Sequence, residues 1–207
     1  MSESGFDLYT ALAYIGLMLL VWGGFWIGMP GMYGTSGAPS RPDLIRAALD
    51  LVHLQPGEKI YDLGAGDGRV VVAAAKAFQA RGIGVEIEPA HCLVAQLRIV
   101  LNGVVGRASI RQKNLLDVKL DDADVVFLYL SPKVLDRLAP QLILKLHPGA
   151  RVVSVHFPIE GWRPVDVNVG YLLFAYQMPP APGSVDDLLK SWQEAGFQGG
   201  DPVERAE

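Results

Sequence analysis

Cysteine and positive charge are scarce in this chain of 207 residues. The single cysteine, Cys92, cannot form an internal disulfide, and a zinc site built on thiolates needs more than one. The 18 Lys and Arg residues are outnumbered by 22 Asp and Glu, which gives a formal net charge of −4. That balance argues against nucleic-acid binding through bulk electrostatics, and no nucleic-acid partner is expected. The four histidines are dispersed without ligand spacing, so we expect no metal site.

Charged side chains are missing altogether between Asp7 and Arg41. Within that stretch, Leu8–Met29 is as long as the roughly 20 apolar residues that span a bilayer. Trp22 and Trp26 near its end suit the membrane interface. We therefore predict a single transmembrane helix in an N-terminal membrane anchor (residues 1–30), followed by a Gly/Ser/Pro-rich linker (residues 31–41).

Two alternatives to an anchor are a cleavable signal peptide and a buried helix. A signal peptide would begin with basic residues, whereas this chain begins with acidic ones. Arg41 and Arg46 are the positive charges nearest the apolar run, so the positive-inside rule places the main domain in the cytoplasm, or in the mitochondrial matrix of a eukaryote. The pair Gly24 and Gly28 could join two such helices, although the spacing alone is often incidental.

Strand-like and helix-like segments alternate after the linker. Apolar stripes and N-terminal prolines predict helices over residues 43–53, 69–78, 89–101 and 132–146. Short apolar runs predict strands over residues 59–62, 82–87, 108–112, 123–130, 150–155 and 171–178, with a looser one over 165–169. The alternation predicts an α/β domain over residues 42–178, doubly wound around a mostly parallel sheet. Residues 179–207 are expected to form a Pro-rich polar tail with a short helix over 185–195.

A glycine-rich turn joins the first strand to its helix. A dinucleotide fingerprint would need glycine at the position of Arg69, and the Gly-Lys-Ser/Thr of a P-loop is absent. Acids at both ends of the turn suit a ligand that carries an ammonium and a carboxylate, as S-adenosylmethionine (SAM) does. The alternative is a protein that uses these glycines only to turn. The expected cofactor-binding residues here are Asp62, Gly64, Ala65, Gly66, Asp67 and Gly68.

Two further segments extend the predicted SAM site. Glu86 ends the second strand, where a carboxylate can accept hydrogen bonds from both ribose hydroxyls, and Ile87 could pack on the adenine. Asn114 follows the third strand and could read the adenine amino group, with Leu115 beside it. Asn114 could equally be a turn residue.

Four stretches of the chain together resemble one family. They read YDLGAGDGR (61–69), GVEIEP (84–89), DVVFLYLSPKVLDRLAPQL (124–142) and PGARVVSVHFPIEGWRP (148–164). Over residues 39–178 the chain is similar to the seven-β-strand protein-lysine methyltransferases that act on the ATP synthase c subunit and the adenine nucleotide translocase, and to their archaeal broad-specificity relative. The resemblance implies a Rossmann-like methyltransferase sheet of seven strands with a C-terminal antiparallel strand, SAM as cofactor, and a protein substrate presenting a lysine, which could itself be a membrane protein.

One family feature is absent. Where the family tends to have an aromatic residue before Val-Pro-Ser/Thr, this chain has Gly37, and Tyr33 could take its place. Tyr129 and Ser131 lie at the carboxyl end of the fourth strand, where the reacting group of such a fold lies, and are the predicted catalytic residues. Tyr129 could orient a substrate amine or be a core tyrosine, and His156 could accept a proton or be structural.

The sequence thus predicts a membrane-anchored SAM-dependent methyltransferase acting on protein lysine. One alternative is methylation of a small molecule at the membrane, such as a quinone or a lipid. Another is a SAM-binding interaction module without turnover. Residues 128–132 lack the Asp/Asn-Pro-Pro-aromatic tetrad used on nucleobase nitrogens, which disfavours a nucleic-acid acceptor.

Overall fold

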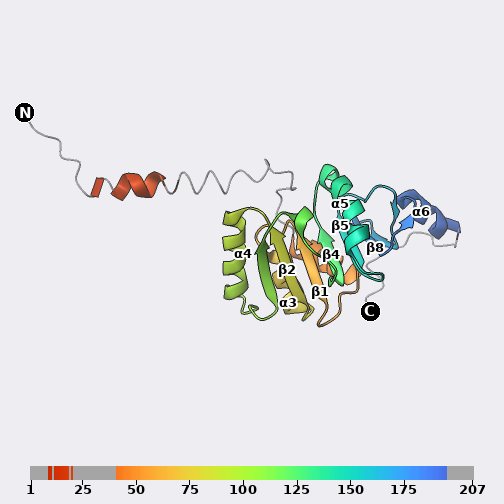
Figure 1. Cartoon of the computed structure of the whole chain (residues 1–207), viewed down its shortest axis with the longest axis horizontal. Helices are drawn as coiled ribbons and strands as arrows, with labels where there is room; N and C mark the ends of the chain where they lie inside the picture. Colours follow the sequence, from red (N-terminus) through yellow and green to blue (C-terminus); the bar gives the residue numbers. More distant parts are fainter. Residues whose placement is uncertain (1–8, 11, 19, 21–40, 195–207) are drawn as a thin grey trace, which may run out of the picture. The chain divides into compact units, whose positions relative to one another are not determined.

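The computed structural model describes residues 9–10, 12–18, 20 and 41–194. The chain divides into two compact units, residues 1–37 and 38–207. Figure 1 shows the second unit as a sheet wrapped by helices. The first unit is described at its helical residues 9–10, 12–18 and 20.

The predicted transmembrane helix is contradicted, and with it the single-pass membrane localisation. Within the described part of the chain, no helix is both long enough and apolar enough to cross a membrane. Several predictions fall outside the described residues: the linker up to Ser40, the interfacial Trp22 and Trp26, the Gly24 and Gly28 pair, Tyr33, Gly37, and the tail after Glu194.

A seven-stranded sheet forms the centre of the second unit, in the order β3-β2-β1-β4-β5-β8-β7. The first five strands in the chain are parallel, and β8 runs antiparallel to both β5 and β7. This arrangement confirms the predicted doubly wound, mostly parallel α/β fold with a C-terminal antiparallel strand. The strands are β1 (Lys59–Leu63), β2 (Arg81–Glu86), β3 (Ala108–Gln112), β4 (Val125–Leu128), β5 (Arg151–Val155), β7 (Asp166–Asn168) and β8 (Leu173–Gln177).

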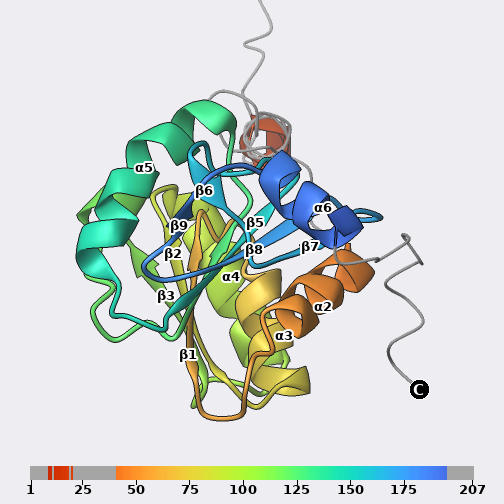
Figure 2. The same cartoon turned by 90° about the vertical axis from the view of Figure 1, so that its right-hand side faces the viewer.

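Helices cover both faces of this sheet (Figure 2). Helices α2 (Pro42–Leu51), α3 (Arg69–Ala77) and α4 (Pro89–Leu101) lie on one face, and α5 (Pro132–Lys145) lies on the other. Because side chains alternate along a strand, Ile60 packs toward α2 and α3, whereas Tyr61 packs toward α5. Both are at most 1% exposed, so the parallel strands are buried on both faces, as their continuous apolar sequences indicate.

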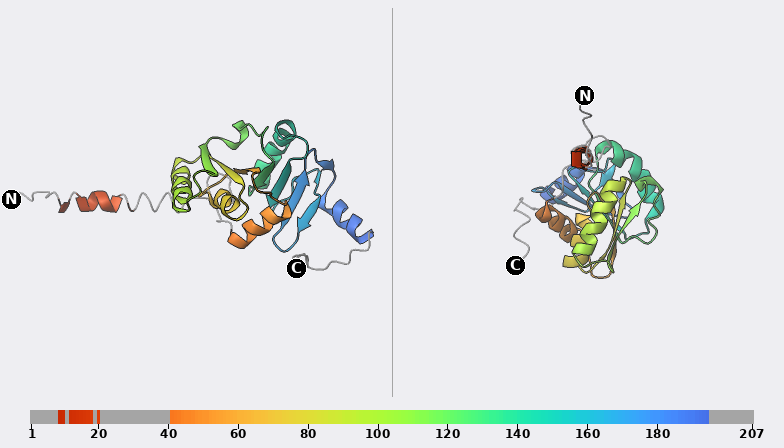
Figure 3. Two further views of the ribbon diagram at one scale, coloured as in Figure 1. Left: turned by 90° about the horizontal axis from the view of Figure 1, so that it is seen from below. Right: turned by 90° about the vertical axis from the view of Figure 1, so that its left-hand side faces the viewer.

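The residues predicted as a polar tail begin with elements that pack on the domain. Strand β9 (Ala181–Pro182) pairs with β6 (Trp162–Arg163) in a separate two-stranded sheet, and α6 (Val185–Glu194) follows. Leu188 on α6 is 6% exposed and belongs to the core cluster on the α5 face. Figure 3 shows α6, in blue, at the end of the sheet made by the last strands.

Candidate active site

The predicted site residues converge where the strand order changes direction. The chain winds outward from β1 through β2 to β3, then returns to place β4 on the other side of β1. Leu63 at the end of β1 pairs with Val85 of β2 and with Leu128 of β4. Gly64, Glu86 and Tyr129, which each come next along the chain, therefore share the carboxyl edge of the sheet. Doubly wound proteins bind their ligands at this position.

The glycine-rich turn is anchored to β2 but open above Gly66. The backbone N–H groups of Gly64 and Ala65 both donate to the carbonyl of Val85, at 2.8 and 3.0 Å. Gly66 has φ +50, and a Cβ placed there would meet no atom within 4 Å. At Gly68, with φ +75, a Cβ would lie 2.8 Å from the Cβ of Ala95 on α4. Gly66 thus leaves room for a ligand to approach the backbone, whereas Gly68 allows α3 and α4 to pack closely.

The carboxylate of Glu86 joins the end of β2 to this turn. Its Oε2 accepts from the backbone N–H of Gly66 at 2.8 Å, and its Oε1 accepts from those of Ile87 and Glu88 at 2.8 and 3.0 Å. A carboxylate offers about four acceptor positions, so one remains on Oε2 beside the turn. The side chain is held rigidly at 7% exposure with acceptor capacity to spare.

Asp62 is a buried carboxyl group beside two other acids. It is 3% exposed, and the described residues provide no hydrogen bond to its side chain. Burial, together with the charges of Glu86 and Asp67, raises the pKa of Asp62 to about 8. A cation placed against this carboxyl group would reverse that shift, so the site favours a positively charged ligand group here.

Asp67 differs from Asp62 because two arginines of the chain already neutralise it. Its Oδ2 lies 2.6 Å from Nη2 of Arg69 and 2.8 Å from Nη2 of Arg98, and Nε of Arg98 donates to the Asp67 carbonyl at 2.9 Å. Burial favours the neutral acid, but the hydrogen bond and charge of Arg69 and the charge of Arg98 hold the pKa of Asp67 below its ordinary value. These contacts tie the turn to α3 and α4, and cofactor binding by this side chain stays a prediction.

The predicted adenine residues lie beside Glu86. The N–H of Lys113 donates to the Glu86 carbonyl at 2.9 Å, which brings the residues after β3 next to the end of β2. Asn114 accepts from the N–H of Leu116 at 3.0 Å and caps the short 3-10 helix η1 (Leu115–Asp117), so the structure shows it as a turn residue. Leu115 packs partly on the core, and Ile87 is 56% exposed at the same edge.

Tyr129 lies against His156, for which the sequence leaves open a role as proton acceptor or as structural residue. Its hydroxyl lies 3.2 Å from Nδ1 of His156, and the two rings meet edge to face with centroids 5.0 Å apart. Ser131 is the residue before α5, and its carbonyl accepts from the first turn of that helix. The contact between Tyr129 and His156 could not be found from spacing, because the two residues are 27 positions apart.

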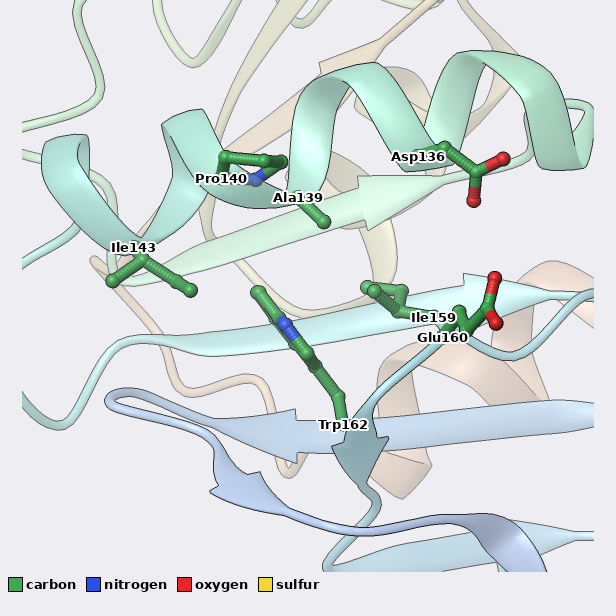
Figure 4. Close-up of a pocket in the computed structure, with 7 residues that line it drawn as sticks. All are labelled: Asp136, Ala139, Pro140, Ile143, Ile159, Glu160 and Trp162. Carbon is green, nitrogen blue, oxygen red and sulfur yellow. The ribbon is translucent and has the colours of Figure 1, made fainter.

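A groove of about 340 Å³ lies apart from these residues, between α5 and residues 159–162. Figure 4 shows the acidic side chains of Asp136 and Glu160 at one end and the indole of Trp162 facing α5 near Ile143. None of the predicted cofactor or catalytic residues lines it.

The residues at the carboxyl edge fit SAM. Asp62 is a buried carboxyl group without a cationic partner in the described structure, and SAM carries an ammonium group. The open backbone at Gly66 and the remaining acceptor position of Glu86 follow the adjacent strands β1 and β2, so both can face one ligand at this edge. SAM supplies a methyl group on a sulfonium, an electrophile that needs no further activation.

Comparisons with known proteins agree with this geometry. The family model described as the ANTKMT methyltransferase domain matches residues 62–166. A protein-lysine N-methyltransferase of Saccharolobus islandicus is 37% identical over 145 residues, which are 67% of this chain and 90% of that protein. The mouse adenine nucleotide translocase lysine N-methyltransferase is 37% identical over 131 residues, 63% of this chain and 56% of that protein.

A solved structure is also similar. The RNA methyltransferase from Salinibacter ruber in complex with S-adenosyl-L-homocysteine has a TM-score of 0.66 and 35% identity, covering 72% of this chain and 99% of that one. The matched family model includes the glycine-rich turn, Glu86, Tyr129 and His156. The chain therefore belongs to the ANTKMT methyltransferase domain family and is a SAM-dependent methyltransferase.

Proposed function

We propose that this protein transfers the methyl group of SAM to the side-chain amine of a lysine in a protein substrate. The observation that carries the proposal is the position of Tyr129: it follows β4 directly, beside the glycine-rich turn, with its hydroxyl held by the ring of His156. A hydroxyl at that edge can orient an amine toward the sulfonium methyl. The names of the archaeal and mouse relatives support lysine as the acceptor.

In this proposal each predicted residue has a distinct part in holding the cofactor. Asp62 pairs with the ammonium group, whose positive charge would lower the raised pKa of this carboxyl group. The backbone of residues 64–68 borders the methionine portion, and the remaining acceptor position of Glu86 accepts from a ribose hydroxyl. Ile87 covers one face of the adenine, and Asn114 and Leu115 border its edge.

The transfer itself depends mainly on alignment and on the protonation state of the lysine. Because the attack is an in-line displacement, the protein must hold the nitrogen, the methyl carbon and the sulfur on one line. A lysine has an ordinary pKa of about 10.4 and attacks only when neutral. Tyr129 is half-buried against an apolar cluster, and apolar surroundings of this kind favour the neutral amine by desolvation. Ser131, at the start of α5, would lie near the entrance.

Calorimetric titration of SAM into the full-length chain tests cofactor binding. Replacing Glu86 by Ala removes the carboxylate that would accept from the ribose and frees the Gly66 N–H, so we expect the affinity to fall by about 10- to 100-fold. Glu88→Ala is the matched control, because it removes the same charge two residues away and should bind SAM as the parent does. Equal affinities for the two variants would contradict the role given to Glu86.

The acceptor is tested with tritiated SAM and three separate substrates: lysine-rich histones, total RNA and a lipid extract. Amino-acid analysis of the labelled protein should recover methylated lysine. Label confined to RNA, as the name of the Salinibacter structure would suggest, or confined to lipid, would overturn the lysine proposal. SAM binding without transfer to any of the three would favour an interaction module.

A further inference from the structure

Tyr129 and His156 are each the first residue after a strand, and the two strands, β4 and β5, are neighbours in the sheet. Leu128, the last residue of β4, pairs with Ser154 of β5, so Tyr129 and His156 leave the same edge of the sheet. The Tyr129 hydroxyl lies 3.2 Å from Nδ1 of His156, with the rings inclined at 82°. The pair therefore stands at the edge where the substrate amine is proposed to enter.

The backbone of His156 is held in an unusual conformation. Its φ of +67 lies in the left-handed region, which is uncommon for residues other than glycine. Three hydrogen bonds fix the segment: His156 N–H to the Leu172 carbonyl at 2.8 Å, Ser154 Oγ to the Phe157 carbonyl at 2.6 Å, and Ile159 N–H to the Tyr176 hydroxyl at 2.9 Å. Strain that the surroundings enforce in this way is concentrated at functional sites. Here it directs the imidazole at Tyr129.

We propose that Tyr129 and His156 form a relay that removes the proton from the substrate ammonium; the inference rests on the proposed lysine acceptor. The Tyr129 hydroxyl passes its own proton to Nδ1 of His156 and takes one from the lysine Nζ. The freed nitrogen lone pair then forms the bond to the methyl carbon. The electron pair of the carbon–sulfur bond stays on sulfur, and the imidazolium releases its proton to water.

The two groups suit this task. The nitrogen of a neutral imidazole that carries no proton is an acceptor, so it can take the proton of a hydroxyl. A free lysine has a pKa of about 10.4, and desolvation of the ammonium and the positive sulfonium nearby both lower it. The His156 ring contacts the hydroxyl of Tyr129, and the backbone N–H of His156 donates to the uncharged carbonyl of Leu172. His156 acts through Tyr129 and is a positioning residue.

The test uses His156→Gly in the full-length chain. Glycine adopts φ +67 without strain, so the variant is expected to fold, and it leaves a space that free imidazole can enter. The matched control is His53→Gly, because His53 also has a positive φ (+49) and is exposed at the end of α2, away from the site. Tyr129→Phe removes the hydroxyl and keeps the ring.

The rate is measured between pH 6 and 10 with saturating SAM and lysine-rich histones, or with the acceptor found above. For His156→Gly we expect kcat at pH 7.5 to fall about 100-fold, as for other general bases, with little change in SAM affinity. The loss should shrink toward pH 10, where lysine loses its proton unaided, and added imidazole should restore part of the rate. His53→Gly should follow the parent profile. A His156→Gly profile parallel to the parent at every pH, with no response to imidazole, would overturn the relay.

Nitrogen-15 NMR of the protein without SAM gives a readout independent of turnover. The relay requires the neutral His156 ring to carry its proton on Nε2, because Nδ1 accepts from Tyr129. Tyr129→Phe should then shift the tautomer balance toward Nδ1–H. An unchanged balance would contradict the relay. If no lysine substrate is methylated, the proposed function fails. The nitrogen-15 measurement of the His156 tautomer still shows, in that case, whether Tyr129 and His156 are hydrogen-bonded.

Discussion

At the scale of single residues, the site combines two acids with opposite electrostatic situations. The charge of Asp67 is neutralised by ion pairs with Arg69 and Arg98, and its lowered pKa keeps the side chain ionised. These ion pairs hold the glycine-rich turn against α3 and α4. Asp62 is buried without such compensation, and its pKa is raised. The ion pairs of Asp67 stabilise the fold. An ionised Asp62 carboxylate, in contrast, lowers the stability of the protein as long as no cation is bound beside it. A high cost of this kind in the ligand-free protein is typical of a binding site.

Asp62→Asn should therefore stabilise the ligand-free protein at high pH. The folded pKa of about 8 exceeds the ordinary value of 3.8, so between these values the folded chain holds a proton that the unfolded chain has lost. Stability consequently falls as pH rises through this window, and the penalty is complete above pH 8. Asparagine cannot ionise, so the variant should avoid a penalty of at least ~1 kcal/mol at pH 8.5, which corresponds to about 2–4 °C in Tm.

Thermal melts at pH 4 and pH 8.5, with and without SAM, check this expectation. At pH 4 the two proteins should melt at similar temperatures, because Asp62 is neutral in the folded parent. With SAM the order at pH 8.5 should reverse, since the variant lacks the carboxylate that meets the ammonium. Lower stability of the variant at pH 8.5 without SAM would show that the buried charge carries no penalty.

The sequence identified most of these residues but not their partners. The spacing of Asp62, the glycines and Glu86 predicted the turn and the strand end correctly. It could not show that Asp67 meets Arg98, 31 residues away, because only the packing of α4 against α3 brings them together. Sequence periodicity reports which side of an element is buried, whereas side-chain pairing between elements depends on the tertiary fold.

At the scale of the elements, the contact of α3 with α4 fixes the geometry of the glycine-rich turn. Gly68 is the residue before α3, and its Cα faces Ala95 of α4. Helix α3 also packs closely on the sheet, since Val71 lies against Gly82 of β2. The packing of α3 on α4 and on β2 holds the turn in place. The side of the turn away from these elements stays open to a ligand.

Gly68→Ala should destabilise the fold more than an equivalent change at Gly57. Both glycines have positive φ, +75 and +84, so alanine costs roughly 1–2 kcal/mol at either position. At Gly57 the new Cβ meets nothing within 4 Å, whereas at Gly68 it lies 2.8 Å from the Ala95 Cβ. Separating the helices adds a cost of about 1–3 kcal/mol.

Urea denaturation of the two variants measures the difference. In the Gly68→Ala background, Ala95→Gly removes the opposing Cβ and should recover part of the lost stability, even though it weakens α4 by about 1 kcal/mol on its own. Equal destabilisation at residues 57 and 68 would mean that α4 moves aside freely and does not constrain the turn.

The boundaries of helices and strands were predictable where the hydrophobic periodicity was clear or where proline and glycine residues stand at the ends. The helix over residues 89–101 and the strand over 108–112 agree with the structure at both ends, since proline and glycine residues delimit them. The strand predicted over 123–130 is shorter, Val125–Leu128, because apolar residues continue beyond its ladder into the core. Strands β6 and β9 have two residues each and therefore no period to detect.

At the scale of the whole molecule, the domain includes more of the chain than the alternating pattern indicated. The polar composition after residue 179 suggested a tail, yet the apolar side of α6 completes the cluster on the α5 face. An amphipathic helix with one buried leucine gives a weak hydropathy signal, and only tertiary contact shows which surface it covers. At the other end, the uncharged run before Arg41 predicts a membrane span, whereas no helix in the described part of the chain is long and apolar enough to cross a membrane.

Leu188→Ala should lower the stability of the entire second unit if α6 belongs to its cooperative core. Leu188 belongs to the same hydrophobic cluster as Leu135 of α5 and Trp162 of β6. Truncating Leu188 therefore leaves a cavity where several elements pack together. We expect a loss of about 2–4 kcal/mol, within the usual range for a buried leucine. Leu144→Ala is the control, because Leu144 is 85% exposed on α5 and its truncation should change stability by less than about 0.5 kcal/mol.

Urea unfolding of the full-length chain, followed in parallel by tryptophan fluorescence and circular dichroism, distinguishes the two possible organisations. If α6 is integral, Leu188→Ala shifts the single midpoint seen by both probes and leaves the slope unchanged. If α6 were an independent appendage, the fluorescence of Trp192 would change early while the midpoint by circular dichroism stayed at the parental value. Since β9 and α6 cover Trp162 at the end of the segment that carries His156, an integral α6 would also couple the C-terminal residues to the stability of the site.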